Sequence, residues 1–413
     1  MSHVYAILGA GRQGTAAAYD LALRGDASEI RLVDADPLGA RSAAARLERL
    51  LAERPSSLGA PAIRPLPCDV RDGSSLTAAL AGCRAALSAV PYRFNAGAAR
   101  AAIAARCHFN DLGGNTAVVR EQLAMDAEAR AAGISIVPDC GLAPGMSQTL
   151  AVFAMSKIAR PRHVRIRCGG LPQTPRPPLG YRLVFNVAGL TNEYTGTAVC
   201  LRQGKLTELP ALTELEEIEF PRPVGKCEAF LTSGGTSTAP WTFAGKLETY
   251  DYKTVRYPGH YDRVRCLADL GYFGTEPVLA GGAMIAPREL TQALFERTLD
   301  FPDDPDLVVL RVECLGENSA DPSSGRPARQ SRAETAAGSP MAAYRIDLLD
   351  FQDPETGFTA MERTTAFPAA IVTFLQATGG VAPGATPLET AVPAERFVSL
   401  LERRGFKIVH ARL

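Results

Sequence analysis

The sequence lacks the features that mark a membrane-embedded or secreted protein. Its 413 residues contain no uninterrupted apolar run of the roughly 18 to 20 residues that a membrane-spanning helix needs. The amino terminus has no basic segment followed by an apolar one, which a secretory leader would show. We therefore expect a soluble, cytoplasmic protein.

An excess of one charge is also missing. Lysine and arginine together number 44, and so do aspartate and glutamate, which gives a formal net charge of +0 at pH 7. Nucleic acids and anionic membrane surfaces attract basic proteins. The balance therefore argues against nucleic-acid and membrane partners and favours an enzyme with a small-molecule substrate.

Paired cysteines are absent as well. The chain has nine cysteines, and no two of them are close together in the sequence. An odd number of scattered cysteines is typical of buried thiols in a reducing compartment rather than of disulfides or a zinc site. We predict no metal.

The stretch from His3 to Asp34 has the pattern of a dinucleotide-binding unit. A short apolar run precedes Gly-Ala-Gly-Arg-Gln-Gly, an alanine-rich helical segment follows, and a second apolar run ends in Asp34. The first glycine permits the tight turn, the second lets the backbone approach a pyrophosphate, and the third lets helix and strand pack closely. The first N–H groups of the helix then face the phosphates. The predicted cofactor contacts in this turn are Gly9, Gly11, Arg12, Gln13 and Gly14.

Asp34 predicts which dinucleotide binds. A carboxylate at this position accepts hydrogen bonds from the adenosine ribose hydroxyls and repels a 2′-phosphate. Ala35 and Asp36 follow, so no adjacent basic residue could receive that phosphate. The sequence favours NAD over NADP.

Later segments extend this unit into a doubly wound parallel sheet of six strands and five helices, complete by about residue 138. Cofactor contacts are expected where strands end, because the carboxyl ends of parallel strands meet at one edge. They are Asp69, Val70, Ser88, Val90, Tyr92, Gly113 and Gly114. For Asp69, capping of a helix that begins near Ser74 is equally open. Asp111 could cap a helix, bind a substrate ammonium, or do both.

From about residue 163 the pattern changes to strand-like segments separated by long loops. These segments are His163–Cys168, Lys226–Leu231, Lys246–Val255, Leu307–Val312 and Ala343–Leu349, with one clear helix at Pro287–Leu299. They predict an α+β substrate domain with a mixed or antiparallel sheet. Residues 316–340 are a low-complexity stretch, which predicts a mobile loop.

The length of the chain favours two domains over one. We expect an α/β fold, with a Rossmann doubly wound parallel sheet plus the α+β domain. The NAD-binding domain is placed at residues 1–140 and is completed by the helical tail at 366–413. The substrate domain is placed at residues 141–365.

Residues 232–238, Thr-Ser-Gly-Gly-Thr-Ser-Thr, form one dense polar cluster in the second half. Glycines flanked by hydroxyls can form an anion-binding nest or a hydrogen-bonding wall, with Thr236 and Ser237 as candidate substrate contacts. A plain polar turn is the open alternative.

Residues 252–260 form the other cluster. In an extended strand, Lys253 and Tyr257 lie on one side and Arg256 on the other. Arg256 could hold a substrate carboxylate bidentately, and Lys253, Tyr257 or His260 could transfer protons. Tyr257 is also a candidate substrate contact. A solvated sheet face is the open alternative.

The order of several motifs along the chain resembles the lysine 6-dehydrogenases of the saccharopine-dehydrogenase-like superfamily. The motifs are GAGRQG, VPYRFN, DLGGN, PDCGLAPGM, CGGLP, EAFLTSGGTST and YKTVRYPGH. The resemblance implies a Rossmann domain completed by the carboxyl-terminal tail and a central substrate domain that also mediates oligomerisation. It further implies NAD as the oxidant and a homo-oligomer, dimer or tetramer. Residues 316–340 look like an insertion relative to this pattern.

The resulting hypothesis is the NAD-dependent oxidative deamination of the ε-amino group of L-lysine. The product, 2-aminoadipate 6-semialdehyde, would cyclise to a piperideine carboxylate. Arg256 is assigned to the substrate carboxylate, and His260 and Lys253 are the candidates for proton transfer, with Asp111, Thr236 and Ser237 as further contacts. Two alternatives remain open: a saccharopine- or carboxynorspermidine-type enzyme that reductively joins an amine and an aldehyde, and a non-catalytic NAD-binding regulator.

Overall fold

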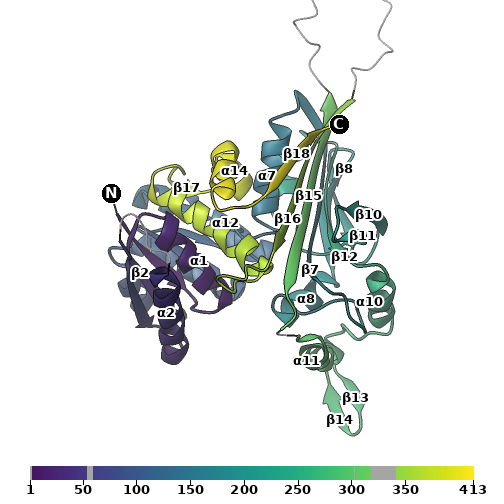
Figure 1. The fold of residues 1–413 in the computed structure, drawn as a ribbon, viewed down its shortest axis with the longest axis horizontal. Coiled ribbons are helices and arrows are strands. Elements are labelled where there is room, and N and C mark those ends of the chain that lie inside the picture. The colour runs from purple at the N-terminus through teal and green to yellow at the C-terminus, as the bar shows by residue number, and fades with distance from the viewer. Residues whose placement is uncertain (1, 54–58, 302, 318–340) are drawn as a thin grey trace, which may run out of the picture.

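The computed structural model describes residues 2–53, 59–301, 303–317 and 341–413. The described chain forms two halves, each built on one large sheet (Figure 1). Among the described residues, no helix is long and apolar enough to span a bilayer. All nine cysteines are free; seven are buried, Cys68 is partly buried and Cys266 is exposed.

The first half is built on a seven-stranded parallel sheet with the order β17-β6-β5-β4-β1-β2-β3. Its strands are β1 (His3–Leu8), β2 (Ala27–Asp34), β3 (Ala62–Pro67), β4 (Ala85–Ser88), β5 (His108–Asp111), β6 (Ser135–Val137) and β17 (Gly384–Ala385). Because β1 lies between β2 and β4, the strand order reverses at its carboxyl end, which is where such sheets bind ligands. The predicted Rossmann sheet is confirmed, and the tail adds a seventh strand.

Helices cover both faces of this sheet. They are α1 (Arg12–Arg24), α2 (Pro37–Ala52), α3 (Gly73–Leu80), α4 (Asn95–Ala104), α5 (Thr116–Leu123), α6 (Asp126–Ala132) and α12 (Ala360–Ala377), with a short 3-10 turn η1 (Tyr92–Phe94). The helices α5 and α6 are separate because the chain leaves helical geometry at Met125, where ψ is 13°. Helix α12 comes from the carboxyl-terminal tail and packs on α1, β4 and β5.

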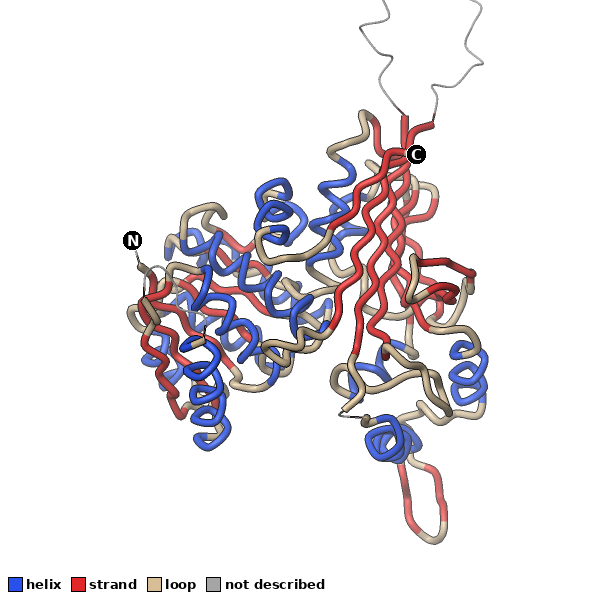
Figure 2. Tube along the Cα trace, viewed as in Figure 1, coloured by secondary structure: helices blue, strands red, loops and turns tan. Residues whose placement is uncertain are grey.

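The second half is built on a nine-stranded mixed sheet whose path is β10-β11-β12-β7-β15-β16-β18, with β8 joined to β12 and β9 joined to β8. The strands are β7 (Arg160–Pro172), β8 (Thr197–Arg202), β9 (Lys205–Pro210), β10 (Glu216–Phe220), β11 (Gly225–Leu231), β12 (Thr249–Arg256), β15 (Asp306–Glu317), β16 (Met341–Phe351) and β18 (Ile408–Arg412). The pair β12 and β7 is parallel, and the pairs β15–β7 and β15–β16 are antiparallel. The predicted mixed sheet is confirmed. Figure 2 shows its long strands side by side, with the helices of the first half on one side of them.

Residues 316–340 are only partly described. Gly316 and Glu317 are the last residues of β15 rather than part of a loop, and Met341 begins β16. The rest of the predicted mobile loop, residues 318–340, lies outside the described residues.

Shorter elements complete the second half. They are α7 (Met146–Met155), α8 (Val187–Glu193), α9 (Ala239–Phe243), α10 (His260–Asp269), α11 (Pro287–Leu299), α13 (Leu388–Ala391), α14 (Ala394–Glu402) and a hairpin of β13 (Val278–Ala280) and β14 (Ala283–Ile285). Helix α11 has the predicted bounds, whereas α8, α9 and α10 were not predicted. Helix α7 packs on β7, β15 and β16.

The carboxyl-terminal tail contributes to both halves. Helix α12 and β17 belong to the first sheet, and β18 pairs with β16 in the second. Just after α14, the buried guanidinium of Arg404 donates to both carboxylate oxygens of buried Asp20 in α1. The tail therefore ties the two halves together.

Candidate functional site

The glycine turn between β1 and α1 fits the phosphates of a dinucleotide. Gly9 has φ +93°, and a β-carbon on Gly14 would collide with the carbonyl oxygen of Gly9. Gly11 is the amino-terminal cap residue of α1, and a β-carbon there would have nothing within 4 Å. The space outside Gly11 lies at the positive end of α1, where backbone N–H groups are free to bind an anion.

Asp34 lies directly beside this turn. Its Oδ2 accepts from the backbone N–H of Ala10 at 2.7 Å, and its Oδ1 accepts from that of Asp36 at 2.9 Å. Each carboxylate oxygen can accept a second hydrogen bond. The side chain is therefore held in place with capacity left for a ribose hydroxyl.

The ends of β4 and β5 lie close to the glycine turn and to each other. A β-carbon on Gly9 would lie 3.2 Å from Cγ1 of Val90, and one on Gly114 would lie 3.2 Å from Cδ1 of Tyr92. Four predicted cofactor contacts are thus brought to one edge of the sheet. Ser88, another of them, is buried and its hydroxyl donates to a side-chain amide at the start of α4.

Asp69 pairs with Arg71, whose Nη2 lies 2.5 Å from its Oδ2. The alternative that Asp69 caps the following helix is wrong, because the carboxylate of Asp72 accepts from the N–H groups in the first turn of α3. The predicted cofactor contacts of Asp69 and Val70 stay predictions.

Asp111 is completely buried at the end of β5. Its Oδ1 accepts from the backbone N–H groups of Gly113 and Asp139, and its Oδ2 accepts from Nε2 of Gln122. It does not cap a helix, because Asn115 caps α5. Asp111 instead fixes the loop after β6, which carries Asp139, against the glycines after β5, and its carboxylate accepts three hydrogen bonds from the protein.

Asp139 occupies the end of β6, the next strand along the same edge, and the sequence analysis assigned it no role. Its φ of +61° lies in the left-handed region, which a non-glycine residue adopts at a cost and which is frequent at functional sites. Its side chain is buried, and a β-carbon on Gly113 would collide with its Oδ1. Asp139 therefore lies against Gly113, one of the predicted cofactor contacts.

The electrostatics of Asp139 suit proton transfer near neutral pH. Burial and, secondly, the negative charge of Asp111 raise the pKa of Asp139 to about 7, while the hydroxyl of Ser237 opposes this rise by donating to Oδ2. Its Oδ1 is buried without a hydrogen-bond partner among the described residues. A carboxyl with a pKa near the working pH and one unoccupied oxygen can accept a proton from a ligand.

The cluster at residues 232–238 connects the two halves. Ser237 contacts Asp139, whereas the hydroxyl of Thr236 donates to the carbonyl of Val199 at 2.9 Å within the second half. The hydroxyl of Thr238 donates to Glu389 in α13. Of the two predicted substrate contacts, the structure thus brings Ser237, and not Thr236, to the carboxyl group of the first half.

Strand β12 separates the residues of the second cluster by face, as the extended pattern predicts. On the face that also carries Thr254, the guanidinium of buried Arg256 donates to Glu193 at 3.1 Å and lies over the ring of Tyr181 at 4.7 Å. On the other face, Nζ of Lys253 donates to Oε2 of Glu216 at 2.8 Å. Lys253 therefore lies on the opposite side of the sheet from Arg256, within an ion-pair network.

Tyr257 lies with the residues of the Lys253 face. Its side chain packs against the small apolar cluster formed by residues such as Leu171 and Val255. Its hydroxyl donates to the carbonyl of Pro172 at 3.1 Å. The structure does not place it with Arg256.

His260 is a packed side chain in the first turn of α10. Its Nδ1 lies 3.0 Å from the carbonyl of Leu179 and its Nε2 lies 2.9 Å from the hydroxyl of Tyr194. Since a carbonyl only accepts, Nδ1 carries the proton and Nε2 accepts from the tyrosine. Burial and the positive charge of Arg256 lower the pKa of His260 to about 3. The ring is neutral with both nitrogens occupied, so the geometry gives no support to proton transfer by His260.

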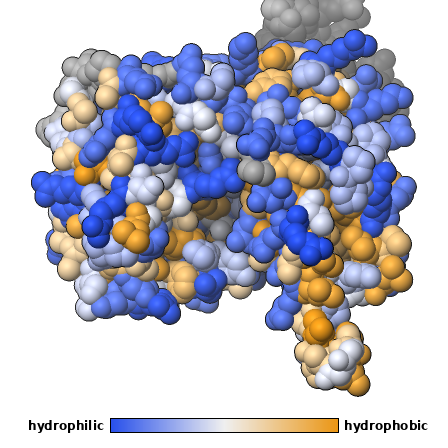
Figure 3. All heavy atoms as spheres, turned by 60° about the horizontal axis from the view of Figure 1, so that its bottom comes forward, coloured by the Kyte–Doolittle hydropathy of each residue, from blue (hydrophilic) through white to orange (hydrophobic). Residues whose placement is uncertain are grey.

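The first turn of α12 joins the glycine turn to the second sheet. Nε of Arg12 donates to Glu362 at 2.6 Å, and the amide of Gln13 donates to the carbonyl of Met361 at 3.4 Å. A β-carbon on Gly170, in β7, would lie 2.5 Å from Cε of Met361. Figure 3 shows the surface hollowed between the two halves. The carboxyl edge of the first sheet and one face of the second are therefore the two walls of a crevice.

Two family models together match most of the chain. The one described as the saccharopine dehydrogenase NADP binding domain matches residues 5–137, and the one described as the saccharopine dehydrogenase C-terminal domain matches residues 141–406. The first half is therefore an NAD(P)-binding domain.

Curated relatives and one solved structure are similar to the chain. The saccharopine dehydrogenase (NADP(+), L-glutamate-forming) of Pyricularia oryzae is 25% identical over 221 residues, 51% of this chain and 48% of that protein. That of Saccharomyces cerevisiae is 24% identical over 216 residues, 50% of this chain and 48% of that protein. The chain thus spans about half the length of the curated relatives it matches. The apo structure of the L-Glu-forming saccharopine dehydrogenase from Saccharomyces cerevisiae covers 100% of both chains with a TM-score of 0.75 and 18% identity, which shows a shared fold.

Proposed function

The chain belongs to the saccharopine dehydrogenase family, and we propose that it is an NAD-dependent dehydrogenase that removes the ε-amino group of L-lysine. The observation that carries this proposal is the position of Asp139. Its carboxyl group lies at the carboxyl edge of the NAD(P)-binding sheet, against Gly113, and it contacts Ser237 of the second half. Such a group can take a proton from a bound amine where the two halves meet.

In the proposed reaction the substrate enters as an ammonium group. NAD, when bound, supplies the oxidant, because its nicotinamide takes up the hydride that leaves Cε. Asp139 removes the proton from the nitrogen, so that the nitrogen lone pair can form the C=N bond as the hydride departs. Water then adds to that carbon, and ammonia and the 6-semialdehyde are released; the semialdehyde cyclises to the piperideine carboxylate.

A substrate panel tests the proposal. The purified chain is assayed with NAD and with NADP, in the oxidative direction with L-lysine, ornithine and saccharopine, and in the reductive direction with amine and aldehyde pairs. We expect NAD reduction with L-lysine and one ammonia for each NAD consumed. Turnover confined to saccharopine would favour the reductive-joining type of enzyme; the curated relatives are named saccharopine dehydrogenases. Tight NAD binding without any turnover would favour a regulator.

Preference for NAD is proposed from Asp34. Its carboxylate is fixed by two backbone N–H groups, and Ala35 and Asp36 add no positive charge. The substitution Asp34→Asn keeps an acceptor oxygen and removes the charge, so we expect the ratio of kcat/KM for NAD to that for NADP to fall by at least about tenfold, as loss of a close like-charge repulsion implies. Steady-state kinetics with both cofactors measure this ratio.

The matched control for Asp34 is Asp269→Asn, because Asp269 is paired with Arg265 on the exposed surface of α10 in the second half. This control should leave the preference unchanged. An Asp34→Asn variant that keeps the full NAD preference would contradict the role proposed for Asp34.

We also propose a homo-oligomer, with the hairpin of β13 and β14 at the contact between copies. Figure 1 shows this hairpin projecting from the body below α11, and Figure 3 shows apolar side chains on it. Val278, Leu279 and Met284 are exposed, as is Leu294 of α11. A two-stranded hairpin alone is marginally stable in water, and an apolar patch of this kind marks an association site.

The substitution Leu279→Glu tests this contact. It is expected to reduce a wild-type dimer or tetramer to a smaller species, measured by light scattering after size exclusion. Leu38→Glu is the matched control, because Leu38 and Leu279 are both 74% exposed and Leu38 lies on α2 of the first half. A monomeric wild type, or a Leu279→Glu variant with unchanged mass, would refute the contact.

A further inference from the structure

One buried arginine has no acidic partner. Among the described residues, four arginines are buried. Three form ion pairs: Arg167 with Glu216 and Asp251, Arg256 with Glu193, and Arg404 with Asp20. The fourth, Arg182, is 3% exposed, and its Nε and Nη1 have no hydrogen-bond partner among the described residues.

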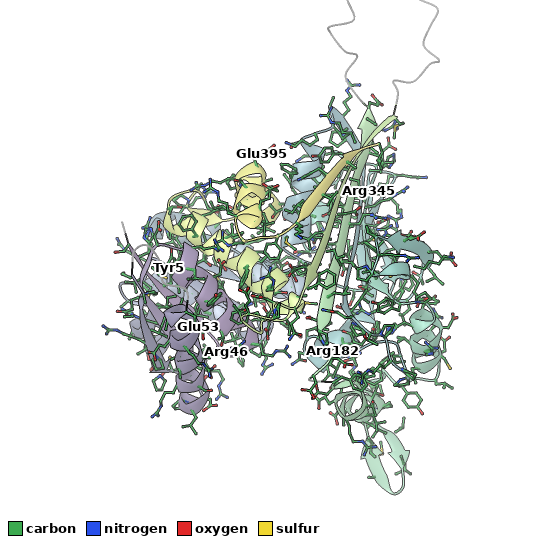
Figure 4. All side chains as sticks on the ribbon, viewed as in Figure 1. Tyr5, Arg46, Glu53, Arg182, Arg345 and Glu395 are labelled. Atoms are coloured by element: carbon green, nitrogen blue, oxygen red, sulfur yellow. The ribbon has the colours of Figure 1, made fainter. Side chains whose placement is uncertain are left out.

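Arg182 lies on the side of the second half that faces α12. Figure 4 shows it at the boundary between the two halves. Its chain neighbour Leu183 is fixed by a backbone hydrogen bond to Leu299, and a β-carbon on Gly170 would lie within 3 Å of both Val184 and Met361. Arg182 therefore belongs to the wall of the crevice that meets the first turn of α12.

Asp306 is the acid whose carboxylate feels the charge of Arg182, but the two side chains form no ion pair. Asp306 is buried, and its two carboxylate oxygens accept from the backbone N–H groups of Ala360 and Met361. Burial raises the pKa of Asp306, while those N–H groups and the positive charge of Arg182 oppose the rise. Asp306 is thus committed to the first turn of α12 and forms no ion pair with Arg182.

A buried, unpaired guanidinium is costly to the folded state, and its planar fork matches an oxyanion bidentately. The other three buried arginines among the described residues are paired with carboxylates, so the exception points to a ligand that supplies the missing anion. Arg256, the sequence-based candidate for the substrate carboxylate, already has Glu193.

We propose that Arg182 binds the carboxylate of the substrate. This assignment deepens the proposed function and rests on it. Asp139 and Arg182 then define the two ends of the bound molecule, an amine at the carboxyl edge of the first sheet and a carboxylate near α12. The crevice would select an amino acid over a simple diamine.

The test compares two substrates that differ only in the carboxylate. Wild type, Arg182→Gln and Arg182→Lys are assayed with L-lysine and with 1,5-diaminopentane at saturating NAD. We expect Arg182→Gln to lower kcat/KM for L-lysine by about 10- to 100-fold, mainly through KM, as loss of a charged hydrogen bond implies. Its kcat/KM for 1,5-diaminopentane should change less than about twofold. Arg182→Lys, which keeps the charge and loses the fork, should lie between the two.

The outcomes distinguish a substrate carboxylate from a cofactor phosphate as the anion that Arg182 binds. A rise in the KM for NAD with an unchanged KM for L-lysine would assign Arg182 to the cofactor phosphates and overturn the proposal. An equal loss for both substrates would make Arg182 merely structural and also overturn it. Arg176→Gln is the matched control, because Arg176 is a half-exposed arginine on the same loop and is paired with Asp304; it should leave both substrates unaffected.

A binding measurement keeps this inference separate from the proposed function. If L-lysine is not oxidised, calorimetric titration of the NADH-bound protein with glutarate still tests the subsite. Glutarate binding by wild type that weakens at least about tenfold in Arg182→Gln supports the subsite. Equal binding, or no binding to either protein, overturns it.

Discussion

Replacing Asp139 with asparagine is expected to lower kcat/KM for amine oxidation by about 100- to 10,000-fold, the range that loss of a general base produces. Asparagine keeps the size of the side chain and can accept from the hydroxyl of Ser237, but it cannot take a proton. NAD affinity should change little, because the carboxylate acts on the substrate. Steady-state kinetics with L-lysine and fluorescence titration of NADH measure the two effects.

The role proposed for Asp139 also predicts the direction in which kcat/KM changes with pH. The pKa of Asp139 is about 7, so the carboxylate that accepts the proton forms as the pH rises through 7. Wild-type kcat/KM should rise over the same interval, and the residual activity of Asp139→Asn should lack that rise. Ser237→Ala removes a hydrogen bond that lowers the pKa of Asp139, so its activity profile should move to higher pH.

The unfolding temperature of Asp139→Asn shows whether a loss of activity comes from lost catalysis or from misfolding. The folded state raises the pKa of Asp139 above its unfolded value, to about 7. The stability linked to protonation of Asp139 is therefore present at low pH and is lost as the pH rises through the folded pKa. At pH 8, Asp139→Asn should therefore unfold at the same or a higher temperature than wild type. Full activity in Asp139→Asn would eliminate Asp139 as the proton acceptor.

Replacing Arg404 with glutamine should have the largest effect on stability. The change leaves the carboxylate of Asp20, which is 1% exposed, without its bidentate cation and with only the more distant Arg24, whose Nε lies 4.0 Å away. Breaking a buried ion pair in this way costs about 3–5 kcal/mol. Arg404 follows α14 and Asp20 lies in α1, so the loss should loosen the tail from the first half. Calorimetry should show a lower unfolding temperature for the transition that includes the NAD(P)-binding sheet, and NADH should partly restore it.

The adjacent residue provides the control for Arg404. Arg403 is exposed, so Arg403→Gln should stay within about 0.5 kcal/mol of wild type, as surface changes do. If Arg404→Gln proved as stable as Arg403→Gln, the buried pair would not hold the tail in place.

The first sheet was predictable because its signals are local. Each strand is a short apolar run, and Gly9, Gly11 and Gly14 follow the first of them at the spacing of a dinucleotide turn. Asp111 is a candidate because it lies at the carboxyl end of a predicted parallel strand. Asp139 follows the carboxyl end of the next such strand, β6. The sequence therefore carries a local signal for Asp139 as well.

The site in the second half was less predictable because its contacts join distant segments. His260 looked available for proton transfer, yet it is occupied by Leu179 and Tyr194, residues 81 and 66 positions away. The alternation of β12 separates Lys253 from Arg256, as the sequence predicts, but only the structure shows that Lys253 is occupied by Glu216. Arg182 carried no motif at all, since only the packed structure shows that it lacks a partner.

The start of α12 falls between these two cases. The sequence places a helix from Ala366, whereas the helix begins at Ala360. Thr359 and Glu362 form a capping box there. The Thr-x-x-Glu spacing is a recognisable sequence signal for the start of a helix. What the spacing could not show is that Glu362 also binds Arg12 and so fixes the glycine turn.

The most direct test of the central claim is the fate of the hydrogens on Cε. L-lysine carrying two deuterium atoms at that carbon is incubated with the purified protein and NAD, and the reduced cofactor is analysed by mass spectrometry. Oxidation at the ε-amino group predicts one deuterium in each NADH formed, with one ammonia released and one deuterium kept in the cyclised product. Reduced cofactor without deuterium, or no reduction of NAD at all, would contradict the proposed function.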